Sequence, residues 1–308
     1  ILIVLFFNVK LPYYIMAPGG TINITDRVVM DNYNKKSKGS LNMLYVSEYE
    51  GTPASLLLAK LKSYDIESNK ERQISNESVK EINRRNTIMR DNSLDIATMV
   101  AYTEAGKSIT IKEKKNVVIA RTKDNGLEVG DIILSADNTT CEDVNDIKKI
   151  INNKEENDTV TFKILRNNKE KEVNSKIYLE SNSKVVGVVI VTEYYDIDPK
   201  IDIKFKNSES GASGGLMLTL TIYNAITDED IIKDRKIAGT GTISYDGTVG
   251  EIDGIKYKIM GAAKDNVKIV FVPTANYEEA IMTKNKYKYD LEIVRVDNFK
   301  EAIEYLKK

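Results

Sequence analysis

The sequence predicts an α+β protein built from several domains, and three observations lead to this prediction. The chain has 308 residues, enough for two or three domains with a sizeable core. Residues 112–178 are rich in short strand-like runs, whereas residues 184–308 alternate strand-like and helical runs. Residues 17–111 are of mixed character. We therefore expect a β-rich middle domain followed by an α/β domain.

Composition and charge exclude several classes of function. The 45 basic and 46 acidic residues nearly cancel, and lysines are interspersed with carboxylates, so no nucleic-acid partner is expected. Cys141 is the only cysteine and the chain has no histidine, which excludes an intrachain disulfide and makes most transition-metal sites improbable. We expect no metal, nucleotide or organic cofactor.

The first segment, residues 1–16, begins with the wholly apolar run Ile1–Phe7. Spanning a bilayer takes about 20 such residues, so this run alone is too short. We interpret it as the end of an N-terminal membrane anchor or signal segment, with Lys10, Tyr13 and Tyr14 at the membrane interface. A buried N-terminal strand is the alternative, because short apolar runs fit either structure.

Residues 17–111 read as a mixed α/β scaffold without a catalytic constellation. The expected elements are a turn at Ala17–Gly20, a strand at Leu44–Ser47, a helix at Pro53–Leu61, and a second helix between Val79 and Glu104.

Residues 112–178 follow a regular strand, helix and hairpin order. The expected elements are strands at Val117–Ala120, Ile132–Leu134 and Thr159–Ile164, a helix at Glu142–Ile151, and a turn at Asn167-Asn168.

The phrase Gly126-Leu127-Glu128-Val129-Gly130-Asp131-Ile132-Ile133-Leu134, followed by that helix and hairpin, resembles a PDZ domain of the bacterial protease-associated type. The resemblance implies binding of extended peptides by addition of a strand to an exposed sheet edge. That edge would be Val117–Ala120, beside the helix at Glu142–Ile151. A small β-rich spacer is the alternative.

Ser213 lies in the glycine-rich turn Ser210–Gly215, which runs directly into an apolar helical pattern at Leu216–Ala225. Without histidine a Ser-His-Asp triad is impossible, so an activated serine needs another base, and lysine is the best candidate. The glycines leave the backbone around Ser213 open, and the helix start supplies N–H groups for an oxyanion. A helix cap without catalytic role is the alternative.

Lys258 is the best-placed base. In the helix expected at Ile255–Lys264, it shares a face with Ile255, Gly261 and Ala262. These small and apolar neighbours allow close packing, which desolvates the amine and lowers its pKa.

Four segments resemble the proteolytic domain of Lon-type serine peptidases. They are Ser210–Met217, Ile237–Ile243, Asp246–Lys258 and Val270–Pro273. The resemblance implies that Ser213 is the nucleophile and Lys258 the general base, with Thr240 near the lysine to orient it. Two positions depart from the family pattern, Ala212 where proline is usual and Gly214 where alanine is usual, and from these we expect a more flexible turn.

The chain also lacks the Gly-x-x-x-x-Gly-Lys-Ser/Thr phosphate loop of the ATPase module. Its order of segments resembles the ATP-independent, membrane-anchored PDZ–Lon peptidases of Gram-positive bacteria. That resemblance implies a serine endopeptidase with a Ser213–Lys258 dyad, held in the cell membrane by a single N-terminal anchor with its catalytic domain outside the cytoplasm. It also implies peptide or protein substrates and leaves a homo-oligomer open. The alternative is a catalytically inactive envelope scaffold that binds peptides through its PDZ-like domain.

Overall fold

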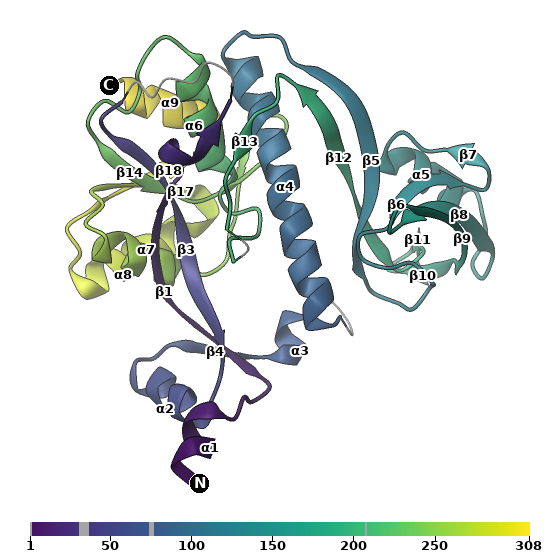
Figure 1. Cartoon of the computed structure of the whole chain (residues 1–308), viewed down its shortest axis with the longest axis horizontal. Helices are drawn as coiled ribbons and strands as arrows, with labels where there is room; N and C mark the ends of the chain where they lie inside the picture. The colour runs from purple at the N-terminus through teal and green to yellow at the C-terminus, as the bar shows by residue number, and fades with distance from the viewer. Residues whose placement is uncertain (1, 31–36, 74–76, 207) are drawn as a thin grey trace. The chain divides into compact units, whose positions relative to one another are not determined.

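The computed structural model describes residues 2–30, 37–73, 77–206 and 208–308. The chain forms two compact units. Unit 1 comprises the chain up to Arg72, Ile96–Ser108 and Ile201–Lys308, and unit 2 comprises Gln73–Asp95 and Ile109–Lys200. Each unit is built from segments that are not consecutive in the sequence (Figure 1).

Unit 1 is organised around a six-stranded mixed sheet with the order β18-β17-β14-β3-β1-β4. The strands are β1 (Tyr13–Asn23), β3 (Ser40–Glu50), β4 (Asp65–Ser68), β14 (Lys236–Gly239), β17 (Ile269–Pro273) and β18 (Glu292–Val296). β14 pairs in parallel with both β3 and β17, whereas β1 pairs antiparallel with β3 and β4. Two small sheets, β2–β13 (Val28–Val29 with Asp202–Ile203) and β15–β16 (Thr242–Ile243 with Val249–Gly250), lie beside it.

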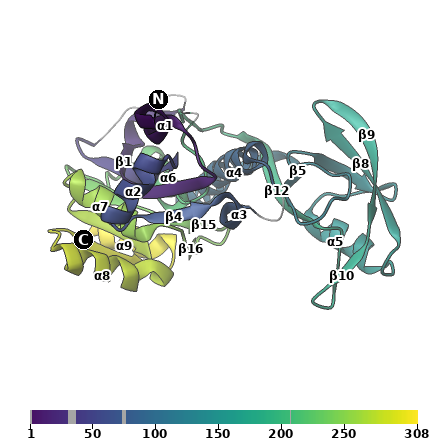
Figure 2. The ribbon, with the colours of Figure 1, turned by 90° about the horizontal axis from the view of Figure 1, so that it is seen from below.

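Helices cover both faces of this sheet. One face packs against α7 (Ile255–Lys264) and α8 (Tyr277–Tyr287), with a buried cluster that includes Val270, Val272 and Ile259. The intervening Phe271 points to the other face, where its ring meets Tyr305 of α9 (Phe299–Lys307). α6 (Gly215–Ile226) and α9 contact each other, and Figure 2 shows the helical layers from a second direction.

The division of the chain expected from the sequence differs from this arrangement. The expected scaffold, residues 17–111, supplies β1 and β3, which are interior strands of the same sheet as β14, β17 and β18. The start of the expected 184–308 domain supplies β12 (Val188–Asp198), which pairs with β5 (Thr110–Arg121) in unit 2. Hydrogen bonding between strands that are distant in the chain leaves no local pattern in the sequence. Domains made of consecutive residues were therefore the simplest prediction.

The turn expected at Ala17–Gly20 is wrong, because these residues continue strand β1. The pairing of β1 with β3 shifts between Pro18 and Gly20, as in a β-bulge. Gly19 is tightly enclosed there, since a Cβ on it would lie 2.1 Å from the carbonyl oxygen of Tyr45. Pro and Gly signal a turn in many sequences, but here they mark a bulge and a close approach of backbone.

Unit 2 contains a sheet with the strand order β12-β5-β6-β8-β9. Its elements are β6 (Ile132–Ala136), β7 (Thr139–Thr140), α5 (Val144–Asn152), β8 (Thr159–Arg166), β9 (Lys169–Lys176), β10 (Tyr178–Glu180) and β11 (Ser183–Val185), beside the first part of α4 (Val79–Glu104). α5 buries Ile147 and Ile151 in a core with Val118 and Phe162. Asn167 and Asn168 form the expected turn between β8 and β9, both with positive φ.

The sheet edge expected at Val117–Ala120 is not an edge. These residues lie inside β5, where β12 pairs with them on one side and β6 pairs with Asn116 and Val117 on the other. The chain itself therefore supplies the strand that we expected a bound peptide to supply. The free edge next to α5 belongs to β12, whose Thr192 Oγ1 accepts a hydrogen bond of 3.3 Å from the Val144 amide at the start of α5.

The apolar N-terminal run forms a helix, α1 (Leu2–Asn8), and not the buried strand that was the alternative. The side chains of Ile3, Phe6 and Phe7 are exposed. Within the described residues, no helix has both the length and the apolar character needed to span a bilayer.

Candidate active site

Ser213 is held at the start of a buried helix. Every residue of α6 except Ala225 is buried, because the sequence Gly215–Ile226 is apolar on all sides and lies between the sheet and α9. Gly211 takes φ of 87°, a conformation that favours glycine, in the turn before the serine. Ser213 itself is half-buried. The serine is therefore partly exposed, in a turn that leads into a buried helix.

Three hydrogen bonds fix the serine turn to the segment after β14. The Gly241 amide donates to the Ser213 carbonyl oxygen at 2.8 Å, and the Leu216 amide donates to the Gly241 carbonyl oxygen at 3.1 Å. The Thr240 hydroxyl donates to the same Ser213 oxygen at 3.0 Å. The Thr240 amide in turn donates to the Phe271 carbonyl oxygen of β17 at 3.1 Å. The position of Ser213 is thus tied to the sheet through Thr240.

Lys258 approaches the same threonine from α7. Its Nζ donates a hydrogen bond of 3.2 Å to Thr240 Oγ1. The side chain is 3% exposed because α7 packs closely on β1: a Cβ at Gly261 would lie 2.8 Å from the Gly20 nitrogen. The close packing that we expected from Gly261 is confirmed, and its partner is the glycine bulge of β1.

Burial lowers the pKa of the Lys258 amine to about 8, although the charges of Asp253 and Glu48 act in the opposite direction. The neighbouring Lys256 behaves differently. Burial acts to lower its pKa too, but its hydrogen bond to Tyr257 and the charge of Asp65 outweigh burial, and the pKa of Lys256 is raised. Of these two lysines, only Lys258 holds an appreciable neutral fraction near neutral pH.

Thr240 therefore links the two residues. Its hydroxyl accepts a hydrogen bond from Lys258 Nζ and donates one to the backbone carbonyl oxygen of Ser213. No direct hydrogen bond joins Ser213 Oγ to Lys258 Nζ in the described part of the chain. Catalytic hydrogen bonds are often longer in a free enzyme and tighten when substrate binds. The arrangement ties the backbone of Ser213, through Thr240, to a buried amine that can be neutral.

The turn also offers donors for a negatively charged oxygen. The amides of Ser213 and Gly214 donate no hydrogen bond to another described residue, and they precede the first residue of α6. Free N–H groups at the start of a twelve-residue helix stabilise an anion.

Gly214 has a packing role that the sequence did not indicate. A Cβ at this position would lie 2.3 Å from the Sδ of Met43 in β3. Met43 thus occupies the space that an alanine methyl group would need, which explains glycine at this position. The turn is packed against Met43 at this position, and the flexibility expected from Ala212 and Gly214 stays a prediction.

An ion pair just before the turn was also missed from the sequence. Arg27 Nη1 donates to Glu209 Oε2 at 2.6 Å, and the Glu209 side chain is 12% exposed. The two residues are 182 positions apart, so no sequence spacing points to the pair. Among the described residues, no group of three or more carboxylate or thiol side chains is arranged to hold a metal ion.

Two family models match the chain. Residues 169–307 match the model described as the Lon protease (S16) C-terminal proteolytic domain, and residues 103–177 match the PDZ domain model. The chain carries a PDZ domain and a Lon-type proteolytic domain. The α+β class predicted from the sequence is confirmed.

Individual relatives of the Lon-type domain are distant. A Lon protease of Mesomycoplasma hyopneumoniae is 30% identical over 98 residues, which cover 32% of this chain and 11% of the relative. The archaeal Lon protease of Halobacterium salinarum is 31% identical over 104 residues, which cover 33% of this chain and 15% of the relative. This chain therefore matches less than a fifth of the length of these relatives. The solved PDZ domain of an SdrC-like protein from Listeria monocytogenes is 18% identical and covers 27% of this chain and 93% of its own, with a TM-score of 0.25.

Proposed function

We propose that the chain is an ATP-independent serine endopeptidase in which Ser213 is the nucleophile and Lys258 the general base. The observation that supports it most is the buried Lys258 amine, whose pKa is lowered to about 8 and which shares the Thr240 hydroxyl with the carbonyl of Ser213. A base of this kind is suited to work near neutral pH.

The reaction begins when the Ser213 hydroxyl turns toward Lys258. Neutral Nζ takes the hydroxyl proton while Oγ bonds to the peptide carbonyl carbon, and the carbonyl electron pair moves onto oxygen. The amides of Ser213 and Gly214 stabilise this oxyanion. Collapse of the intermediate expels the amine, which takes the proton from the Lys258 ammonium and leaves an acyl ester on Ser213.

The second half of the reaction repeats these proton transfers with water. Lys258 accepts a proton from the water as its oxygen bonds to the acyl carbon, and Ser213 Oγ then leaves and recovers that proton. Thr240 keeps the Lys258 amine in place during both halves, because its own hydroxyl is committed to the Ser213 carbonyl.

The PDZ domain would present extended peptides to this site by β-strand addition. The proposed edge is β12, beside α5, since β5 is already paired on both sides. Residues Val188–Val191 pair with β5 on one side and belong to the terminal strand of the sheet order.

We place the protein at the cell membrane, held by the N-terminal segment, with its catalytic domain outside the cytoplasm. The apolar, exposed α1 supports this location. Cleavage without ATP is part of the same proposal, and it follows from the likeness in segment order to ATP-independent PDZ–Lon peptidases. We expect the same cleavage rate with and without Mg-ATP.

Mass-spectrometric analysis of a diverse peptide mixture tests the proposed dyad. Ser213→Ala and Lys258→Met should each lower cleavage by about a thousandfold or more, because either change removes a covalent or proton-transfer partner. The matched control is Lys256→Met on the same helix, which should stay within a few-fold of the unaltered chain. Equal cleavage by Lys258→Met and Lys256→Met would refute the assignment.

A peptide-binding scaffold without catalytic activity is the second candidate, favoured by Ala212 and Gly214 in the serine turn. The two candidates differ in one result. If the unaltered chain cleaves nothing while peptides still bind at β12, the scaffold is the better account.

A further inference from the structure

Exposed apolar side chains concentrate at one end of unit 1. Nineteen large hydrophobic residues are exposed in the described ranges, and ten of them belong to two short segments. These ten lie in or next to α1 and α2 (Pro53–Leu61). We call them the α1–α2 surface: Ile3, Val4, Leu5, Phe6, Phe7, Val9, Tyr13, Leu57, Leu58 and Leu61. Figure 1 shows α1 and α2 next to each other at the end of unit 1 where β1 begins.

α1 is apolar around its whole circumference. Successive residues of an α-helix are about 100° apart, so the five residues Ile3–Phe7 point in all directions. Each of their side chains is between 41% and 76% exposed. A helix that is apolar all round is stable when it is surrounded by apolar material, and a groove on a partner protein covers only part of it.

α2 (Pro53–Leu61), by contrast, has a single apolar outer face. Leu57, Leu58 and Leu61 fall within an arc of about 100°, and they are 55%, 47% and 78% exposed. Ala59 points inward and is 1% exposed. A helix with a single apolar face can lie flat on an apolar phase, with that face buried and its other side in water.

The two helices form one surface, since their flanking residues are hydrogen-bonded to each other. The Leu11 amide donates to the Gly51 carbonyl oxygen at 2.8 Å, and the Gly51 amide donates to the Tyr13 carbonyl oxygen at 2.7 Å. Gly51 immediately precedes Thr52, the N-cap of α2. α1 and α2 are therefore anchored to the same point of β1 and contact each other.

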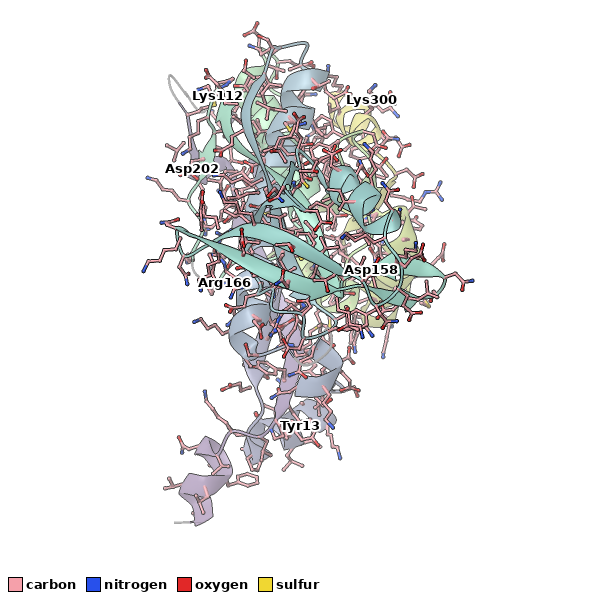
Figure 3. All side chains as sticks on the ribbon, turned by 90° about the vertical axis from the view of Figure 1, so that its right-hand side faces the viewer. Tyr13, Lys112, Asp158, Arg166, Asp202 and Lys300 are labelled. Carbon is pink, nitrogen blue, oxygen red and sulfur yellow. The ribbon has the colours of Figure 1, made fainter. Side chains whose placement is uncertain are left out.

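Residues typical of a membrane interface surround this surface. Lys10 follows α1, Lys60 and Lys62 lie at the end of α2, and the Lys62 Nζ lies 5.9 Å from the centre of the Tyr64 ring. Lysine and tyrosine are favoured where apolar surface meets lipid headgroups. Figure 3 labels Tyr13 close to α1 at this end.

We propose that the α1–α2 surface binds a lipid bilayer, with α1 inserted and the leucine face of α2 lying on the membrane. The second contact goes beyond an N-terminal anchor alone, because it fixes which side of unit 1 faces the membrane. It does not depend on peptidase activity.

An environment-sensitive dye tests the contact directly in the full chain. Cys141 is the only native thiol, so Cys141→Ala permits a single label at Leu58→Cys or Leu61→Cys. The matched control is Met282→Cys on α8, whose side chain is 63% exposed in the same unit. Vesicles of phosphatidylcholine, with and without phosphatidylglycerol, are then added.

We expect the dye emission at positions 58 and 61 to shift to the blue on vesicle addition, with no shift at position 282. A dye at Phe6→Cys should shift as well. A shift at position 6 without one at positions 58 and 61 would overturn the proposal, because α1 alone would then contact the lipid.

A second measurement uses the triple variant Leu57→Ser, Leu58→Ser and Leu61→Ser. Its vesicle partition coefficient should fall by about tenfold or more, since three leucines lose their burial in lipid. Cleavage of soluble peptides without vesicles should not change, which separates this test from that of the dyad. If the triple variant instead converts a multimer to a monomer in sedimentation while vesicle binding is unchanged, the face joins two copies of the chain and the membrane proposal is wrong.

Discussion

Thr240 is the residue that explains how a buried lysine and a surface serine are kept together. Its hydroxyl has one proton to donate, which goes to the Ser213 carbonyl, so its lone pair is available to the Lys258 amine. The sequence placed Thr240 near the lysine by resemblance alone. Its link to Ser213 required the fold, because the two residues are 27 positions apart.

The buried amine of Lys258 should cost stability, which gives a prediction at the residue scale. The pKa of Lys258 is about 8 in the folded chain and 10.5 in the unfolded reference, so the unfolded state binds more protons between these values. The cost is therefore fully present below pH 8 and disappears toward pH 10.5. Lys258→Met removes the amine while retaining the apolar stem.

We expect Lys258→Met to unfold at higher temperature than the unaltered chain at pH 7, with a gain on the order of 1–3 kcal/mol. The gain should shrink as the pH approaches 10.5. Thermal denaturation at several pH values measures it. A loss of stability at pH 7 would mean that Lys258 is not desolvated as the structure indicates.

At the scale of elements, the sequence predicted helices and strands well where periodicity and caps agree. The helices expected at Pro53–Leu61 and Ile255–Lys264 match α2 and α7 at both ends. A Thr52 capping box begins α2, and Gly254 with φ of 69° precedes α7. The apolar run after Lys184 is divided between two strands, β11 and β12, because Gly187 between them takes φ of 72°. Local patterns predict the type of an element, while the pairing of strands depends on distant partners.

The segment before Ser213 should depend on Arg27. This arginine and Glu209 form a partly buried ion pair, and β13 of the same segment pairs with β2 next to Arg27. Burial acts to raise the pKa of the Glu209 carboxyl, and the hydrogen bond from Arg27 is among the interactions that hold this pKa below its usual value. Arg27→Ala removes that hydrogen bond. We expect a loss of about 1–3 kcal/mol in unfolding free energy and a several-fold lower kcat with little change in KM.

Arg27→Lys should recover part of both losses, because it restores the charge but not the planar donor group. The matched control is Lys268→Ala, whose ion pair with Asp290 is exposed on both sides and should contribute little. Denaturation curves and steady-state kinetics measure these effects. If Arg27→Ala and Lys268→Ala were indistinguishable, the ion pair would not position the turn.

For the whole molecule, the sequence identified both domain types but not how the chain builds them. The motifs around Ser213, Lys258 and Gly126 are local, so they were readable without the fold. The contribution of β1 and β3 to the sheet of unit 1 could not be read from the sequence, since it depends on the parallel pairing of β14 with β3. The packing of α7 against the Gly19-Gly20 bulge was not predicted from the sequence either.

This organisation predicts that residues 184–308 do not fold alone. A fragment that starts at Lys184 lacks β1, β3 and β4, so β14 keeps only β17 as a partner and becomes an edge strand, and α7 loses the surface of β1. We expect no cooperative thermal transition by circular dichroism, in contrast to the full chain. A cooperative transition with dispersed amide signals in the fragment would contradict the arrangement.

The most direct test of Lys258 as the general base is the pH dependence of kcat/KM for peptide cleavage by the full chain. We expect kcat/KM to rise about tenfold per pH unit below an apparent pKa of about 8 and then to level off, because only the neutral Lys258 amine accepts the serine proton. Asp253→Asn should move this midpoint to lower pH, since the charge of Asp253 raises the Lys258 pKa. A profile that stays flat down to about pH 5 would contradict a lysine base.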